Sequence, residues 1–155
     1  MSSTLTRFRK KGGFMQLVQL IETCEPGKKE NLIHLIASED PGWAHLVRSK
    51  TLSVERILDW PQEILMEILP KLPPSITATL MLSTTDYIRE KLEKCIPRSQ
   101  VLEIREAQDR LRVTAGEKFA ASVKLFHVVR EMETRGEINF ATLDPLLMVD
   151  SRLVA

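Results

Sequence analysis

The chain has 155 residues, of which 43% are hydrophobic and 28% are charged, and its formal net charge is +1. This is the composition of an ordinary globular protein that is long enough to bury a core. A net charge so close to zero gives no overall attraction to nucleic acid or to an anionic membrane. No apolar run approaches the roughly 18 residues that cross a bilayer, and no secretory signal is visible, so the sequence predicts a cytoplasmic protein.

Residues 1–11 form a polar and basic N-terminal segment. Its four positive charges are Arg7, Arg9, Lys10 and Lys11. Short basic segments of this kind are typically solvated, and four charges are too few to indicate a phosphate or lipid-headgroup site. We therefore expect a flexible tail over 1–11.

Residues 12–50 contain three short runs with apolar residues at helical spacing. The glycines at 12 and 13 separate the first run from the tail, and proline-containing turns near residues 26 and 41 separate the next two. Three short helices expose more apolar surface than they can cover by themselves. We expect this layer to pack against a second helical layer, from this chain, from another copy or from a partner, through Phe14, Leu17, Leu20 and Leu32.

The remainder of the chain also has a helical pattern. A short extended connector, with Leu52 and Val54 as its apolar anchors, predicts a hinge over 51–56. Residues 57–138 carry several helices that open with proline or a Ser/Thr cap, and Pro70 should kink or end one of them. Thr114 begins a long helix that ends at Gly136. With a C-terminal tail over 139–155, the fold class is all-α.

The segment 97–112 has charges that follow the helical period. Its apolar side carries Val101, Ile104, Ala107, Gln108 and Leu111, and its other side carries Arg98, Glu103, Arg105, Glu106, Asp109, Arg110 and Arg112. Two opposite-charge pairs, Arg105 with Asp109 and Glu106 with Arg110, have the i,i+4 spacing that brings side chains together. Two interpretations follow, a surface that binds another macromolecule and a face that is merely solvated.

Enzymatic chemistry has little support in the sequence. The histidines at 34, 45 and 127 have no metal-ligand spacing, and no glycine-rich phosphate loop is present. Glu103 and Glu106 lie one turn apart but are surrounded by arginine, which favours two ionised, solvated carboxylates. Cys24 and Cys95 belong to no CxxC motif and are predicted to be reduced thiols. We expect no catalytic residue, no metal and no cofactor.

The order of these features resembles the C-terminal half of the bacterial flagellar motor switch protein FliG. The similarity extends from the Gly-Gly pair at 12–13 through the Glu-Asp-Pro turn at 39–41 to residues 129–138. Further matching segments are Trp43, Ala44, Val47 and Arg48, the connector 51–55, and 88–91 (IREK). The resemblance implies an armadillo-like helical layer followed by a second helical module, joined by a swivel.

In that family the charged helix is the torque helix, whose ion pairs with the cytoplasmic loop of a MotA-like stator drive rotation. Arg98 and Glu106 match two of the family's charges. Arg105, Leu82 and Thr114 stand where the family has an acid, a lysine and an arginine. Three of the five expected charges are therefore lost or reversed, and the swivel lacks its two aromatic residues.

The resemblance leads to two hypotheses. The first is a divergent rotor or switch-complex component for motility and chemotaxis, located at the cytoplasmic face of the inner membrane at the flagellar base. The second is a structural adaptor without a torque role, which binds another helical protein through the 12–50 layer. No counterpart of the family's N-terminal or middle domain is present, so we expect either a fragment of a longer protein or a short free-standing relative.

Overall fold

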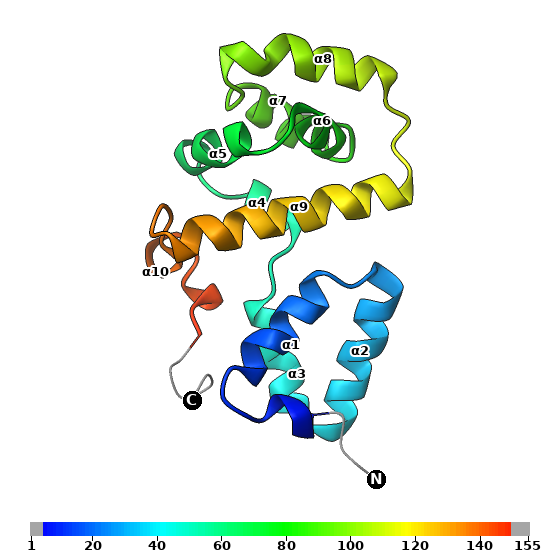
Figure 1. Ribbon diagram of the computed structural model, residues 1–155, viewed down its shortest axis with the longest axis vertical. Coiled ribbons are helices and arrows are strands. Elements are labelled where there is room, and N and C mark those ends of the chain that lie inside the picture. Colours follow the sequence, from blue (N-terminus) through cyan, green and yellow to red (C-terminus); the bar gives the residue numbers. More distant parts are fainter. Residues whose placement is uncertain (1–4, 150–155) are drawn as a thin grey trace. The chain divides into compact units, whose positions relative to one another are not determined.

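The computed structural model describes residues 5–149, and all regular elements in that range are helices (Figure 1). This confirms the all-α prediction. The chain forms two compact units. Unit 1 combines the described residues up to Leu52 with those from Asn139 onward, and unit 2 is Ser53–Ile138.

Each unit consists of short helices joined by tight turns. Unit 1 contains the 3-10 turn η1 (Thr6–Phe8), the helices α1 (Gly13–Glu22), α2 (Pro26–Glu39), α3 (Pro41–Lys50) and α10 (Phe140–Leu143), and the 3-10 turn η4 (Pro145–Leu147). Unit 2 contains α4 (Val54–Leu58), α5 (Gln62–Ile68), η2 (Leu69–Lys71), α6 (Pro74–Leu82), α7 (Asp86–Glu93), η3 (Arg98–Gln100), α8 (Val101–Arg110) and α9 (Ala115–Thr134). No helix between residues 5 and 149 is long and apolar enough to cross a membrane.

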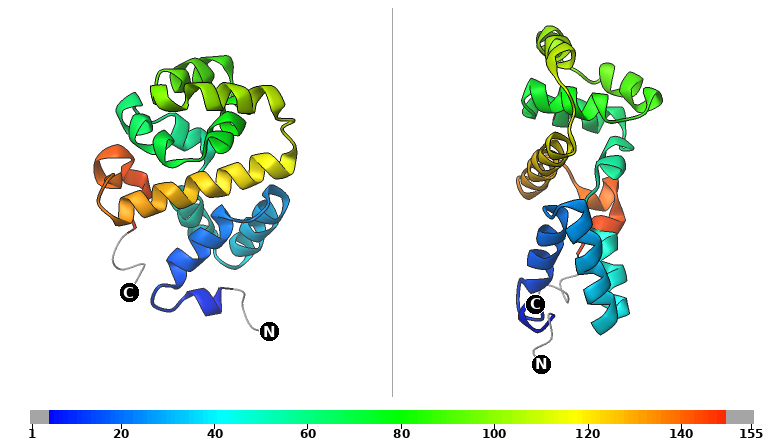
Figure 2. Two further views of the ribbon diagram at one scale, coloured as in Figure 1. Left: turned by 45° about the horizontal axis from the view of Figure 1, so that its top comes forward. Right: turned by 90° about the vertical axis from the view of Figure 1, so that its right-hand side faces the viewer.

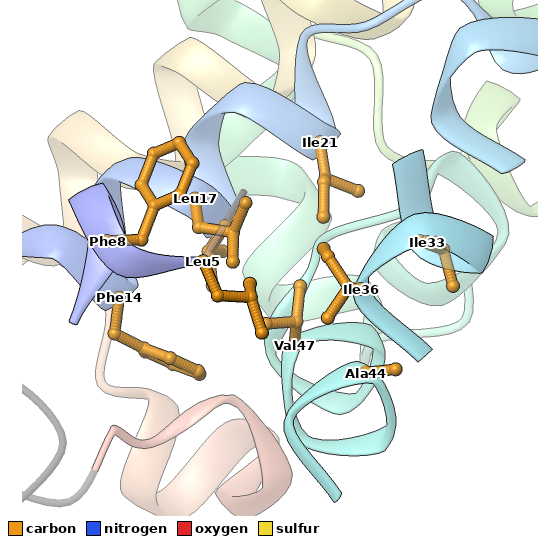
Figure 3. Packing of buried hydrophobic residues seen from close by; sticks show 10 residues of the cluster. Leu5, Phe8, Phe14, Leu17, Ile21, Ile33, Ile36, Ala44 and Val47 are labelled. Atoms are coloured by element: carbon orange, nitrogen blue, oxygen red, sulfur yellow. The ribbon is translucent and has the colours of Figure 1, made fainter. Parts of the chain in front are cut away.

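The segment before α1 is part of the core of unit 1. Leu5 and Phe8 are buried and lie beside the apolar side chains of α1 and α3 (Figure 3). Gly12 adopts a left-handed φ of 78°, and a Cβ on Gly13 would lie 2.1 Å from the carbonyl oxygen of Phe8. The Gly-Gly pair therefore lets the chain turn back on α1 at close range. The prediction of a flexible tail over 1–11 is wrong for residues 5–11, because two apolar side chains hold them against the core; residues 1–4 lie outside the described range.

The same segment is joined to the start of α3. The Arg9 guanidinium donates to Asp40 at 3.0 Å and lies 5.0 Å from the centre of the Trp43 ring. Asp40 also caps α3 by accepting the Trp43 backbone N–H at 3.1 Å. These bonds, that from Trp43 first and that from Arg9 second, hold the pKa of the Asp40 carboxyl below its usual value of 3.8.

The layer of α1, α2 and α3 is covered largely by the chain's own segments. Phe14 and Leu17 are fully buried, and Leu32 packs partly buried against the same cluster. Only Leu20, at 37% exposed, keeps substantial contact with solvent among the four residues predicted to face a second layer. Phe14 and Leu17 are thus core residues of unit 1 and cannot serve as partner contacts in this fold.

The segment that follows unit 2 returns to unit 1. The segment predicted as a C-terminal tail over 139–155 contains α10 and η4 up to Leu147, and residues 150–155 lie outside the described range. Leu147 is buried, and the Lys50 ammonium donates to the carbonyl oxygen of Leu146 at 2.7 Å. The two ends of the described chain therefore both belong to one helical unit.

The connector between the units is anchored by a buried carboxylate. Glu22, at the end of α1 and 5% exposed, accepts the backbone N–H of Leu52 at 2.8 Å. Extended backbone runs only from Thr51 to Ser53, where the Ser53 hydroxyl caps α4. The predicted hinge over 51–56 contains the boundary between the units, but its second half is helical because of that cap.

In unit 2, α6 lies between α8 and α9 (Figures 1 and 2). Its residues Thr77–Met81 are all buried. The long helix α9 begins at the predicted cap, where Thr114 and Glu117 form a reciprocal capping box, and Gly136 follows its end with a φ of 75°. Pro70 ends α5, as predicted, by standing in a 3-10 turn after Ile68.

Replacing Glu22 tests the anchor of the connector. Glu22→Ala leaves the Leu52 N–H buried without this acceptor, which should lower the free energy of unfolding by about 1–3 kcal/mol. Glu22→Gln retains a carbonyl oxygen and should lose less. Urea unfolding followed by circular dichroism measures both, and an alanine variant as stable as the parent would refute the role given to this bond.

The Arg9–Asp40 pair predicts a pH dependence of stability. Because folding lowers the pKa of Asp40, the contribution is complete above its unfolded value of 3.8 and disappears as the pH falls through the lower folded pKa. Asp40→Asn is the matched variant, since asparagine also caps helices but carries no charge. The parent should be more stable than this variant at neutral pH and lose its advantage in acid below about pH 4. Unfolding curves across this range check it, and a gap that stays constant would contradict it.

Candidate functional site

The helix α8 carries the most distinctive surface of unit 2. It packs against α6 through a narrow side on which only Ile104 is fully buried, at 1% exposed. Val101, Ala107 and Gln108 flank it half-buried, and the Gln108 amide contacts the Met81 sulfur at 3.7 Å. This one apolar strip orients the helix and turns its opposite side to solvent.

The helix is shorter than the predicted range 97–112. Residues 98–100 form a separate 3-10 turn after Pro97, and α8 begins only at Val101. At the other end Leu111 is extended, with a ψ of 130°, so Arg112 lies beyond the helix. The predicted apolar residue Leu111 is half-buried in the connection to α9. The apolar period continues past residue 110, but the backbone turns there to begin the approach to α9.

All seven charged residues predicted for partner binding are exposed. They are Arg98, Glu103, Arg105, Glu106, Asp109, Arg110 and Arg112. Within residues 5–149, none of them forms an ion pair or a side-chain hydrogen bond. The expected pairs Arg105 with Asp109 and Glu106 with Arg110 do not form. The charges are therefore available to another molecule, and their role in binding remains a prediction.

An apolar residue that the sequence reasoning missed stands among these charges. Leu102 is 68% exposed on the side of α8 that faces away from α6. The signal was present in the sequence, because Leu102 falls at i−4 from Glu106 and i−7 from Asp109, which places it on the charged side. An analysis that places only the charged residues on the helix does not reveal this exposed leucine.

A small cavity borders α8 on its Arg105 side. Its volume is about 130 Å³, and its wall includes Met81 and Ile96, with Glu93 and Arg105 contributing polar groups. A larger cavity of about 500 Å³ lies between α4 and the turn from α6 to α7, where Val54 and Ile88 line it. Of the two predicted hinge residues, Val54 is half-buried beside this cavity, whereas Leu52 belongs to unit 1 and is fully buried.

The residues examined for catalysis or metal binding do not converge. His34, His45 and His127 are each exposed, and no group of three His, Cys, Asp or Glu side chains in the described part of the chain could hold a metal ion. Cys24 and Cys95 are free thiols. Burial raises the pKa of the Cys95 thiol, which donates to the carbonyl oxygen of Lys91 at 3.2 Å. This is the arrangement of a structural cysteine.

Comparison with known proteins supports one family. The family model of the FliG C-terminal domain matches residues 34–140. No curated protein and no solved structure gives a significant match. The matched range begins after the Gly-Gly pair, within the second half of α2, and covers every helix from α3 to α9. Because the match extends over more than half of the chain, the protein belongs to the FliG C-terminal domain family, whose members are components of the flagellar rotor and switch.

Proposed function

We propose that this protein is a divergent rotor or switch-complex component whose charged helix contacts the cytoplasmic loop of a MotA-like stator, at the cytoplasmic face of the membrane at the flagellar base. The observation that carries the proposal is the set of seven exposed charges on η3, α8 and the following residues, none of them engaged within residues 5–149.

The energetics of such a surface suit a transient contact. An exposed ion pair contributes about 0.2–1 kcal/mol, so several together give an affinity that forms and breaks readily. Opposite charges also accelerate encounter at low salt. A rotor that passes successive stators requires a contact of this kind, whereas a buried apolar interface would hold one stator in place.

The charge pattern predicts an altered partner. Arg98 and Glu106 retain the family's charges, whereas Arg105 reverses one. A stator loop that fits this helix should therefore carry a correspondingly changed charge opposite Arg105. We propose that the other switch-complex proteins are partners as well, through surfaces that do not include α8.

The alternative is a structural adaptor that binds another helical protein, or a second copy, through the layer 12–50. Of the residues predicted to contact that partner, Phe14 and Leu17 are buried inside unit 1, and Leu20 is 37% exposed. Leu35, on α2, is also exposed, at 53%, and is the more exposed of the two leucines. Two scattered leucines support the adaptor less well than seven available charges support the rotor component.

Charge reversal on α8 tests the preferred function. Glu106→Lys should weaken binding to a stator-loop peptide roughly two- to tenfold, because it removes one attraction and adds a repulsion. The affinity of the parent should also fall as salt rises. Isothermal titration calorimetry or fluorescence anisotropy measures both.

The matched control is Glu90→Lys, because Glu90 is also an exposed acid, lies on α7 and forms no ion pair within the described chain. It should leave the affinity unchanged. A peptide in which one cation is replaced by glutamate should recover binding to Glu106→Lys. Affinity that is indifferent to salt and to Glu106→Lys would exclude the charged helix as the contact.

Loss of the gene separates the two hypotheses in the cell. A rotor or switch component is required for rotation, so a deletion strain should lose swimming in soft agar and recover it with the intact gene supplied on a plasmid. The Glu106→Lys gene should restore swimming less well than the Glu90→Lys gene. Normal motility after deletion would favour the adaptor.

A further inference from the structure

The cavity between α4 and the turn from α6 to α7 is a cleft whose described lining residues all belong to unit 2. Its volume of about 500 Å³ falls within the range of natural binding pockets. Val54, Leu58 and Ile88 supply its apolar lining, and exposed polar residues stand around them. No residue of α8 contributes to this lining among the described residues, so the cleft is separate from the charged helix.

Both walls of the cleft are held in place by side chains of α7. The Arg89 guanidinium donates to the carbonyl oxygen of Met81 at 2.9 Å, which fixes the turn from α6 to α7. The Lys91 ammonium donates to the carbonyl oxygens of Leu58 at 2.9 Å and Trp60 at 2.7 Å, which fixes the end of α4. Because one helix ties both walls, the cleft is preformed, and a ligand need not reshape it on binding.

The rim of the cleft on the α4 side is acidic. Glu55 lies on α4, and Asp59 is its C-cap residue with backbone angles that are still helical. Both are exposed line residues of the cleft, and neither forms an ion pair within residues 5–149. At this i,i+4 spacing their Cβ atoms are about 5–6 Å apart on one side of the helix. Arg56, the cation of the described lining, already has an interaction of its own.

The acidic rim selects the chemistry of the occupant. Carboxylates repel the phosphates of nucleic acid and of anionic lipid, which disfavours both as ligands. The apolar lining requires an apolar group, and the two carboxylates require cations on either side of it. An amphipathic helix with an aliphatic residue and with lysine or arginine one turn away on the same side supplies all of these groups together.

We propose that this cleft is a docking site for a short amphipathic helix of another protein, which inserts an aliphatic side chain against Val54 and Ile88 and places lysine or arginine against Glu55 and Asp59. The inference does not rest on the proposed function, because it uses no residue of the charged helix. It gives unit 2 a second contact surface, whose acidic rim accepts only a basic partner.

The test titrates the full chain with a designed peptide of about sixteen residues, a length at which an isolated helix begins to be stable. The peptide consists of alanine and glutamine, with leucine at its centre and lysine four residues before and four residues after it, so that these three side chains form one stripe. Nuclear magnetic resonance of the isotope-labelled protein should show shifts of the methyl signals of Val54, Leu58 and Ile88, with a Kd of about 0.1–1 mM.

Two altered peptides separate the two kinds of contact. Serine in place of the central leucine should raise the Kd at least about fivefold, because the apolar lining then stays uncovered. Glutamate in place of both lysines should abolish the methyl shifts, because the rim repels it. The small amine n-hexylamine, which offers one cation and no helix, should bind at least about tenfold more weakly than the parent peptide.

Variants of the protein locate the contact. Asp59→Lys should raise the Kd roughly three- to tenfold at about 50 mM salt and less at about 500 mM. Ile88→Ala should raise it by a similar factor at both salt concentrations. Glu90→Lys is the matched control, because it makes the same kind of charge change at an exposed acid of α7 outside the lining, and it should bind as the parent does. Circular dichroism and urea unfolding check that each variant is folded, and Asp59→Lys, at an exposed position, decides the matter if Ile88→Ala does not fold.

Four outcomes would overturn the docking site. They are no methyl shifts up to about 5 mM peptide, equal binding of the glutamate peptide, equal losses from Asp59→Lys and Glu90→Lys, and a loss from Glu106→Lys as large as that from Asp59→Lys, which would place the peptide on α8. Binding of n-hexylamine as tight as that of the peptide would assign the cleft to a small amine instead of a protein. None of these results bears on stator binding by the charged helix, so failure here and failure of the proposed function are distinguishable.

Discussion

The packing of α8 onto α6 is the contact on which the functional surface depends. Only Ile104 is fully buried on α8, so the helix is held by a strip one residue wide with half-buried neighbours. Because α6 is itself held by α9 on another side, it presents a firm base for that strip. The rest of α8 must face water, and its charges stay solvated, since burying them would cost several kcal/mol each. The orientation of the charged face is thus a consequence of where the few apolar residues lie.

In unit 1, too, the position of a few apolar residues decides how the chain packs. Three short helices leave an uncovered side, and the segment before α1 covers it with Leu5 and Phe8. The close approach is possible because Gly13 has no side chain where the Phe8 carbonyl lies. The segment after unit 2 adds Leu147 to the same unit. Covering by the chain's own ends weakens the case for a helical partner that fills this layer.

The proposed function depends on an exposed surface rather than on a cavity with convergent groups. Exposed charges suit a repeated, brief contact, because each ion pair contributes little binding free energy and because opposite charges raise the rate of association. The family match covers the whole of α8, and the structure leaves the charges of that helix exposed.

The sequence by itself determined the helical fold class, the caps at Thr114 and Asp40, the end of α5 at Pro70 and the two-sided character of the charged segment. Each of these depends on near neighbours in the chain, through period, backbone restriction or a local hydrogen bond.

Only the tertiary structure decided that residues 5–11 belong to the core, that Phe14 and Leu17 are covered, that Glu22 holds Leu52, and that α8 ends at Arg110. These features depend on residues that are distant in sequence and meet only after folding, such as Leu5 beside Val47 or Glu22 beside Leu52. The local sequence pattern does not predict such long-range contacts, because an apolar residue that will be buried and one that will be exposed cannot be told apart without their neighbours in the fold.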